Sequence, residues 1–315
     1  MIRPQGPNGV HGPRPRRILR RMGAAPANPI SFRTLYASPL VAVREYRCAA
    51  CAGGPGPEEF SAGDTVVLMR HGAFCRHFGR RRVTADANQV AFFPRGSTYR
   101  VSHPASHGDH GTSIALSPRI LGELLEAFDP RFGDDEAATF PFDVGPCAPG
   151  LFRRHADVVR QLAFEREPLA ADVLSLQLAA DALAAAFDHA ARPVGSASRR
   201  RGTHDDHADL VERTKAHFSA HLEGRITLED LARAVHASPF HLARVFQQHT
   251  GTPLHRYFTA LRLRAAATRL VEGERDMSAL ALRYGFASHS HFTGAFRREF
   301  GVPPSAFRRT QTSKI

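Results

Sequence analysis

The C-terminal third of the chain repeats the same residue pattern at a fixed interval of fifty positions. A fixed internal period of this kind indicates a duplicated supersecondary unit. The repeated positions are Leu242 and Phe292, Phe246 and Phe296, Gly251 and Gly301, Pro253 and Pro303, and Ser238 and Ser288.

Each copy has the pattern of two short helices separated by a turn. In the first copy Thr227 precedes acidic residues, as at a helix N-terminus, and Ser238 and Pro239 occupy the cap and first position of a second helix. In the second copy a turn at 285–287 precedes Ser288, which we expect to cap the equivalent helix. The sequence therefore predicts two helix-turn-helix motifs, with second helices at 238–248 and 288–298.

A helical stretch at 253–272 joins the two motifs. Twenty residues at 1.5 Å each span about 30 Å. One turn of B-DNA measures about 34–36 Å. A rigid helix of this length would present both second helices to successive major grooves on one side of a duplex.

Residues 226–308 resemble the DNA-binding domain of the AraC/XylS family of bacterial transcription regulators. The matching stretches are 238–246, 250–253, Tyr257, 281–288, His291-Phe292 and 296–308. The resemblance implies a sequence-specific transcription regulator that binds double-stranded promoter DNA, responds to a small-molecule effector, forms a homodimer and contacts RNA polymerase, as an activator or a repressor. It also implies an α+β chain of two domains, a cupin-like β-barrel or jelly roll with a helical pair followed by an all-α domain.

Both second helices have outward positions that predict contacts with DNA. Arg244 is the strongest candidate for a base contact, because a guanidinium reads guanine bidentately. Phe240, one turn earlier, suits a thymine methyl group; the alternative is a solvated Arg244 beside a half-buried Phe240. Arg297, Arg298 and Arg308 suit phosphates or solvent. The full predicted set is Phe240, His241, Arg244, Gln247, Gln248, His289, Ser290, Thr293 and Arg297.

Two positions depart from the family pattern. His236 stands where the family usually has glycine in the first turn, and we expect it to adopt the left-handed backbone conformation, in which His is enriched. Gly294 stands at the equivalent of Arg244 in the second copy. Because Gly294 has no side chain to reach a base, the second helix is predicted to read less sequence than the first.

Charge is distributed unevenly along the chain, whose net charge is +12. Residues 1–25 hold six arginines and no acidic residue, and residues 208–310 hold 15 lysines and arginines against nine acidic residues. The intervening segment 26–191 is slightly acidic. This asymmetry indicates one domain for phosphates and another for a different ligand.

Composition shifts divide the chain into five segments. Residues 1–28 are rich in Gly, Pro and Arg and are predicted to be a disordered basic tail. We expect a sensor and dimerisation domain at 29–191, a linker at 192–207, the DNA-binding domain at 208–310 and a tail at 311–315. No signal peptide or apolar membrane span is recognised, which favours a cytoplasmic protein with no membrane partner.

Short apolar runs between 30 and 118 predict the strands of a small barrel. They lie at 41–43, 65–69, 90–93, 99–101 and 112–116, and helices are expected from 119 to 128, 151 to 164 and 169 to 191. The last two helices are the predicted dimer contact. Five aromatic residues are candidates either for plain core or for the lining of an effector cavity: Phe74, Phe78, Phe92, Phe93 and Tyr99.

Histidines and cysteines raise the alternatives of a metal-dependent cupin enzyme or a redox or metal sensor with an accessory DNA-binding domain. The histidines are His71, His77, His103, His107 and His110, but no H-x-H pair of metallo-cupins occurs among them. We interpret 103–110 as a surface loop. Cys48 and Cys51 form a single C-x-x-C without the second pair of a structural zinc site. No cofactor, metal ligand or catalytic residue is therefore assigned, and the effector is not identified.

Overall fold

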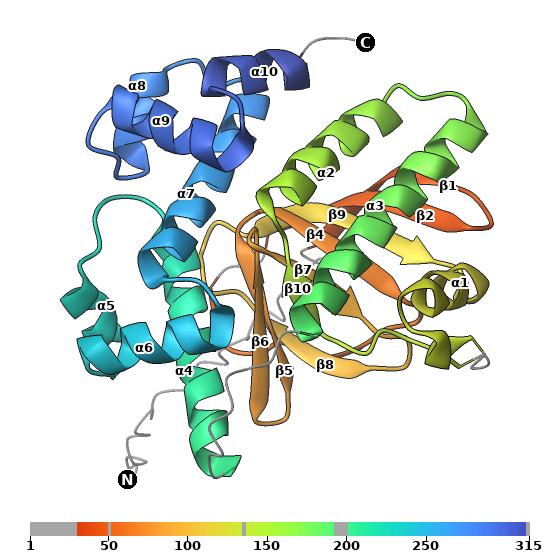
Figure 1. Ribbon diagram of the computed structural model, residues 1–315, viewed down its shortest axis with the longest axis horizontal. Coiled ribbons are helices and arrows are strands. Elements are labelled where there is room, and N and C mark those ends of the chain that lie inside the picture. Colours follow the sequence, from red (N-terminus) through yellow and green to blue (C-terminus); the bar gives the residue numbers. More distant parts are fainter. Residues whose placement is uncertain (1–29, 50–51, 134–136, 192–200, 313–315) are drawn as a thin grey trace, which may run out of the picture.

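The computed structural model describes residues 30–49, 52–133, 137–191 and 201–312. The predicted disordered segment 1–28, Cys51, residues 192–200 of the predicted linker and residues 313–315 lie outside these ranges. Within them the N-terminal part is built on strands and the C-terminal part on helices (Figure 1). The predicted α+β class is confirmed at this level.

Ten strands form two antiparallel sheets. The six-stranded sheet has the order β1-β2-β9-β4-β7-β10, and the four-stranded sheet has the order β3-β8-β5-β6. The strands are β1 (Ile30–Ala37), β2 (Val41–Cys48), β3 (Glu58–Phe60), β4 (Thr65–His71), β5 (Ala73–Phe78), β6 (Arg81–Asp86), β7 (Gln89–Phe93), β8 (Thr98–Ser102), β9 (Asp109–Leu116) and β10 (Val144–Pro146).

The pattern of side chains along the strands explains the packing of the larger sheet. In β2, Val41 and Val43 are buried while Ala42 and Arg44 are more exposed, which is the alternation of a strand with one face on a core. Tyr46, which lies on the other face, is also buried. By contrast, 66–69 in β4 are all buried, because this strand lies between β9 and β7 and is covered on both faces.

Helices α1 (Pro118–Phe128), α2 (Pro149–Leu162) and α3 (Pro168–Ala190) cover the larger sheet, with a 3₁₀ turn, η1 (Pro130–Phe132), after α1 (Figure 1). All three α-helices begin with proline at the first position, and their predicted bounds agree with the structure to within two residues. By length and composition α3 is apolar enough to cross a membrane. It packs against α2, β10 and β2, and seven of its residues are buried.

The C-terminal part contains seven helices. They are α4 (Arg201–Ala220), α5 (Leu228–Ala234), α6 (Pro239–Thr250), α7 (Leu254–Val271), α8 (Met277–Arg283), α9 (His289–Phe300) and α10 (Pro304–Thr312). Helix α4 begins at Arg201, so 201–207 are helical, whereas the sequence predicted a linker there. The composition of 192–207 suggested a flexible segment, but the helical run that packs on α6 extends back into it.

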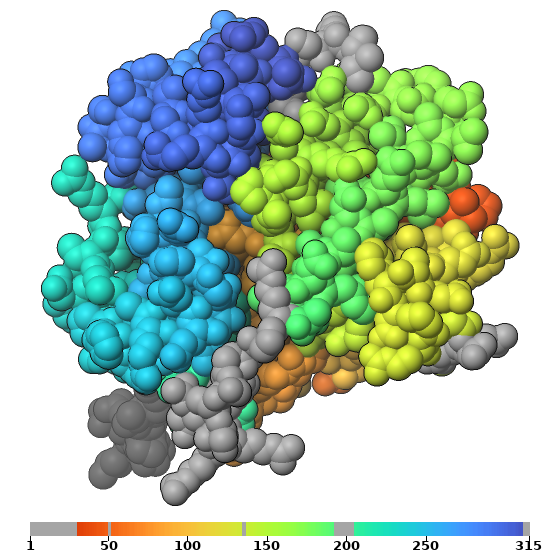
Figure 2. Space-filling model, in the orientation of Figure 1, coloured from red at the N-terminus to blue at the C-terminus, as the bar shows by residue number. Residues whose placement is uncertain are grey.

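The two parts of the chain are in direct contact. Figure 2 shows the yellow-green surface of α2 meeting the blue surface of the C-terminal helices. At this contact Arg153 of α2 donates a hydrogen bond of 2.9 Å to the carbonyl of Phe300 at the end of α9. On another side, α4 packs on β6, where Arg82 pairs with Asp209 at 2.8 Å.

Candidate nucleic-acid interface and interdomain pocket

Helix α6 has one buried face and one open face. Ser238 caps it by accepting a hydrogen bond from the backbone N–H of His241, and Gly251 ends it in the left-handed conformation. Leu242, Val245 and Phe246 are buried. The open face carries four of the predicted DNA-contacting residues as exposed side chains: Phe240, Arg244, Gln247 and Gln248.

Phe240 is 79% exposed, which decides between the two interpretations of this residue. A half-buried phenylalanine would be part of the domain core, but this ring stands in solvent beside the exposed Arg244. His241 differs from the prediction, since it is half-buried and its ring packs edge-on against His207 of α4, with centroids 5.2 Å apart. The open face of α6 therefore centres on Phe240 and Arg244.

Helix α9 repeats this arrangement. Ser288 caps it by accepting from the N–H of His291, and Gly301 ends it in the left-handed conformation. His289, Ser290 and Arg297 are exposed. Thr293 is half-buried, and its hydroxyl is turned away from solvent without a hydrogen-bond partner among the described residues. Of the predicted contacts on this helix, Thr293 is thus the least accessible.

The turns of the two motifs use the same backbone conformation. His236 has φ of 52° and Gly285 has φ of 73°, and in each motif the next N–H bonds back to a carbonyl five residues earlier. The prediction for His236 is confirmed. An added Cβ at Gly285 would lie 2.3 Å from the carbonyl oxygen of Gly224, so the second turn requires glycine for space as well as for conformation.

Helix α7 joins the motifs, with α6 at one end and α9 near the other (Figure 1). Its 18 residues span about 27 Å, somewhat less than the twenty residues predicted. The capping turns at both ends add to this length. The separation remains comparable to the pitch of B-DNA, about 34–36 Å.

The opposite flank of α7 is docked on the β-rich part of the chain. Arg264 is 2% exposed, and its guanidinium donates hydrogen bonds to the carbonyl oxygens of Ala87 and Cys147. The Glu299 carboxylate lies 3.6 Å from the same guanidinium. Further along, Thr268 donates to the carbonyl of Arg70 at 2.8 Å. The helix that separates the two motifs is therefore also part of the surface between the two parts, together with α4, which packs on β6 and β5.

A buried polar cluster strengthens this docking. The Tyr257 hydroxyl donates a hydrogen bond of 2.7 Å to the carboxylate of Asp86, and the Asn88 side chain donates to the carbonyl of Tyr257 at 2.9 Å. Burial raises the pKa of both the Tyr257 hydroxyl and the Asp86 carboxyl. Such groups are costly to bury without partners, so each depends on the other for its hydrogen bonds.

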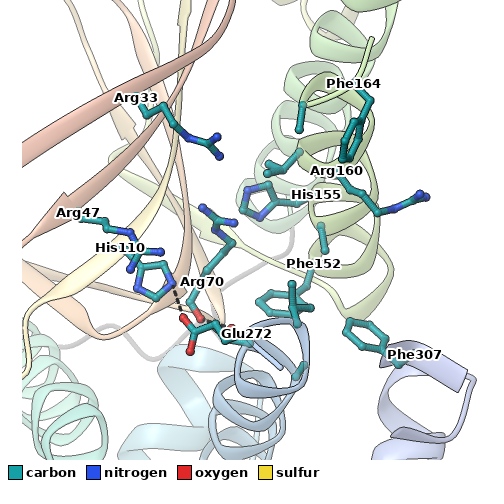
Figure 3. Close-up of a pocket in the computed structure, with 16 residues that line it drawn as sticks. Arg33, Arg47, Arg70, His110, Phe152, His155, Arg160, Phe164, Glu272 and Phe307 are labelled. Atoms are coloured by element: carbon teal, nitrogen blue, oxygen red, sulfur yellow. Dashed lines mark hydrogen bonds and ion pairs between the residues drawn. The ribbon is translucent and has the colours of Figure 1, made fainter. Parts of the chain in front are cut away.

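A cavity of about 270 Å³ lies between the two parts (Figure 3). The sheet contributes Arg33, Arg47, Arg70 and His110, while α2 contributes an apolar wall that includes Phe152 and Val159. Helix α7 closes the cavity with 267–268 and 271–272, and α10 adds Phe307. Arginines therefore face apolar side chains, which is the lining expected for a ligand with an anionic group and a hydrocarbon portion.

The aromatic residues predicted as a cavity lining lie elsewhere. They do not line this cavity. Phe78, Phe93 and Tyr99 lie around Arg76, which is fully buried and lies 4.2 Å from the centroid of the Phe93 ring. Phe74 and Phe92 belong to the hydrophobic core, the other role considered for these residues. Arg76 donates to the carbonyls of Phe92 and Asp143, at 2.8 and 2.6 Å. Burial lowers the pKa of the Arg76 guanidinium to about 10. In this region of the β-rich part, the buried Arg76 guanidinium packs among aromatic rings.

The predicted loop at 103–110 is present over 103–108, where His107 is exposed, while Asp109 and His110 begin β9. His71 lies against His107 and His110, with ring centroids 4.8 and 5.4 Å apart. Burial lowers the pKa of His71 to about 4 and that of His110 to about 3. His103 instead meets Cys48 and Asp109, while His77 bonds to Ser102 at 2.7 Å.

Sequence reasoning missed the residues between the two parts, above all Arg264, Tyr257 and the pocket arginines. Their contacts join residues more than a hundred positions apart, so no local pattern identifies them. One signal was present in the sequence: three consecutive alanines follow Arg264. In the structure 263–268 are all buried. An arginine within so small and apolar a run indicates close packing on every side of a helix.

Comparison with known proteins agrees with the architecture of the C-terminal part. Residues 231–310 match a family described as a helix-turn-helix domain. The transcriptional regulator GlxA of Rhizobium meliloti is 34% identical over 130 residues, 41% of this chain and 39% of that protein. The right origin-binding protein of Escherichia coli is 31% identical over 105 residues, 33% of this chain and 36% of its own length.

Among solved structures, the C-terminal domain of AraT, a response regulator from Geobacillus stearothermophilus, is 29% identical; the match covers 33% of this chain and 88% of that one, with a TM-score of 0.32. The chain thus spans less than two-fifths of the length of the curated relatives it matches. The motifs, the caps and the family match define a helix-turn-helix domain over residues 231–310. Through this domain the chain is similar to AraC-type transcription regulators such as GlxA.

Proposed function

We propose that the whole chain is a sequence-specific regulator of transcription that inserts α6 and α9 into successive major grooves of promoter DNA. The observation that carries this proposal is the pair of equivalently capped helices, each with an open face, at the two ends of α7. In this proposal Phe240, Arg244 and the exposed residues of α9 contact bases, and Arg297 and Arg298 contact phosphates. Arg308 is assigned to structure, since it bonds to the carbonyl of Glu274.

The β-rich part is proposed to be a cupin-like sensor domain at 29–191, followed by a DNA-binding domain at 208–310 whose first helix extends back to Arg201. Two antiparallel sheets covered by helices support this assignment. The homodimer through α2 and α3, the contact with RNA polymerase and the cytoplasmic location stay predictions from the family resemblance.

We also propose that the interdomain cavity holds the effector. Its charge and apolar wall suit an amphipathic anion, and α7 forms one of its sides. A ligand in this cavity would contact the helix that separates the two DNA-reading motifs. Filling the cavity by Val271→Trp is expected to abolish any effect of such a ligand on DNA affinity.

The test of DNA recognition is footprinting with the full chain on a site selected from a random-sequence DNA library. Two protected segments about one helical turn apart are expected. Arg244→Ala should weaken binding to that site by about 1–3 kcal/mol, or roughly 5- to 150-fold. Arg119→Ala is the control, because Arg119 lies on α1 and its side chain is 81% exposed. A single protected segment, or unchanged affinity of Arg244→Ala, would contradict the proposal.

A further inference from the structure

Three side chains with metal-binding atoms converge at one end of the β-rich part. Cys48 Sγ lies 3.4 Å from His103 Nε2, and His103 Nε2 lies 2.9 Å from Asp109 Oδ2. All three donor atoms are within 4.8 Å of one another. This set, the Cys48–His103–Asp109 cluster, shares no residue with the helix-turn-helix motifs or with the lining of the interdomain cavity.

The strand register places these residues together. Cys48 is the last residue of β2 and lies directly opposite Asp109, the first residue of β9, in the six-stranded sheet. His103 follows β8 of the other sheet. The cluster therefore brings together strand ends from both sheets.

The backbone around the cluster is tightly packed. Gly108 has φ of 68°, and an added Cβ there would lie 2.1 Å from the carbonyl oxygen of Cys48. Gly72 has φ of 73°, and its added Cβ would lie 2.3 Å from the carbonyl oxygen of Gly108. Only glycine allows these approaches, so the positions of Cys48 and Asp109 are fixed before any ligand arrives.

The Asp109 carboxylate is the buried anionic group of the cluster. Its side chain is 1% exposed, and its Oδ2 lies 2.9 Å from His103 Nε2. A cation held by both groups would balance the buried negative charge of Asp109. The His103 side chain, by contrast, is 12% exposed, which leaves a route from solvent to the cluster.

We propose that Cys48, His103 and Asp109 bind one divalent transition-metal ion of the zinc type. Thiolate, neutral imidazole and carboxylate are the ligands such ions take, and the two anionic groups balance a charge of +2. Tetrahedral bonds of about 2.0–2.3 Å give ligand separations of about 3.3–3.8 Å. The sulfur–nitrogen distance has this value, and the nitrogen–oxygen distance needs a few tenths of an ångström more. Three protein ligands leave the fourth position to water or another small ligand.

The donor set of Cys, His and Asp differs from the H-x-H pair expected for a metallo-cupin. That pair does not occur among the histidines between 71 and 110. The proposed site gives a role as a ligand to His103, which lies in the loop predicted at 103–110. The proposal concerns the metal site alone, and its test does not depend on DNA binding.

The experiment is a titration of the full chain with Co²⁺ after treatment with chelator and reductant. We expect one equivalent to bind, with a thiolate-to-cobalt charge-transfer band in the near ultraviolet and visible bands of tetrahedral geometry. Added Zn²⁺ should displace the cobalt and abolish the bands. Cys48→Ser should lose the charge-transfer band, and Asp109→Asn should weaken binding at least about tenfold.

His107→Gln is the matched control, because His107 lies in the same loop but outside the cluster; its spectrum should equal that of the unchanged protein. Absence of stoichiometric binding by the unchanged protein overturns the proposal without any variant. A charge-transfer band that survives in folded Cys48→Ser, or one lost in folded His107→Gln, overturns the assignment of the ligands. Circular dichroism identifies variants that fail to fold, and for these His103→Gln replaces the failed substitution.

Discussion

The second helices of the two motifs differ at one equivalent position. Arg244 extends into solvent from α6, while its counterpart Gly294 in α9 offers only backbone. An added Cβ at Gly294 would meet nothing closer than the Arg298 guanidinium at 3.6 Å. The position has room for a side chain, so packing does not require a glycine there.

Replacing Gly294 by alanine should stabilise the protein by about 0.5–1 kcal/mol, because glycine is unfavourable inside a helix. Gly285→Ala is the contrasting variant. Its φ of 73° and the 2.3 Å approach to Gly224 predict a loss of more than about 1 kcal/mol. Urea unfolding measures both, and a destabilised Gly294→Ala would contradict the packing described.

A buried histidine predicts a loss of stability in acid. Burial, and then the charge of Arg70 on β4, lower the pKa of His155 well below its usual value, and its ring bonds to Thr112 of β9 at 2.8 Å. The folded state keeps His155 neutral, whereas the unfolded chain takes up a proton below about pH 6.5. The contribution is therefore fully present above that pH and is lost as the pH falls.

Between pH 6.5 and 5 this group should lower the free energy of unfolding by up to about 1.4 kcal/mol per pH unit. His155→Gln should show a shallower pH dependence than the unchanged protein. His289→Gln, a change at an exposed histidine, should not. If the free energy of unfolding depended on pH equally in His155→Gln and in the unchanged protein, the pKa of His155 would not be lowered in the folded state.

At the residue scale, the sequence indicated the caps and most outward positions, because both follow from helical periodicity. It did not show that His241 and Thr293 are half-buried, because their surroundings depend on neighbouring helices. Periodicity states which face a residue occupies but not what packs on that face. For the same reason the aromatic residues were not recognised as the surroundings of Arg76.

Among the elements, α7 has two roles that rest on different flanks. One flank supports the two motifs, and the other is docked through Tyr257, Arg264 and Thr268. Arg262 additionally holds the loop before α5 by donating to the carbonyl of Leu222 at 2.9 Å. A helix buried on most sides is expected to be rigid, which suits a fixed separation of α6 and α9.

Tyr257→Phe should destabilise the protein by about 1–3 kcal/mol, because it leaves the buried Asp86 carboxylate without one donor. Tyr36→Phe is the matched control, since the Tyr36 hydroxyl bonds to the carbonyl of Pro168 in an exposed position and should cost less than about 0.5 kcal/mol. Thermal unfolding compares the two variants. Equal losses would mean that the contact between α7 and the β-rich part adds nothing.

The sequence predicted helices better than strands. The helices have strong periodicity and clear caps, and their ends fell close to those observed. Strands β1, β5 and β6 were missed, because residues such as Arg33, Arg76 and Arg82 interrupt their apolar pattern. Each of these arginines is explained by a distant partner, Glu45, Asp143 or Asp209 respectively. Long-range pairing of this kind has no local signature.

For the whole molecule, the fixed separation of α6 and α9 predicts a strict spacing in the DNA site. Inserting five base pairs between the two halves of a selected site turns one half to the far side of the duplex. Affinity should fall at least about tenfold, or 1.4 kcal/mol. Replacing five base pairs at constant length is the control. Fluorescence anisotropy measures both, and equal affinities would exclude simultaneous binding of both motifs.

The buried Arg264 limits how this chain can be recombined with others. A chimera that joins its C-terminal helices to a foreign N-terminal half would lose the Ala87 and Cys147 carbonyls. Only the Glu299 carboxylate, 3.6 Å away, would stay beside the buried guanidinium. Engineers who exchange input modules would therefore need to transplant the β6–β7 turn and the segment after β10 together with the helices, or replace Arg264 by an uncharged residue.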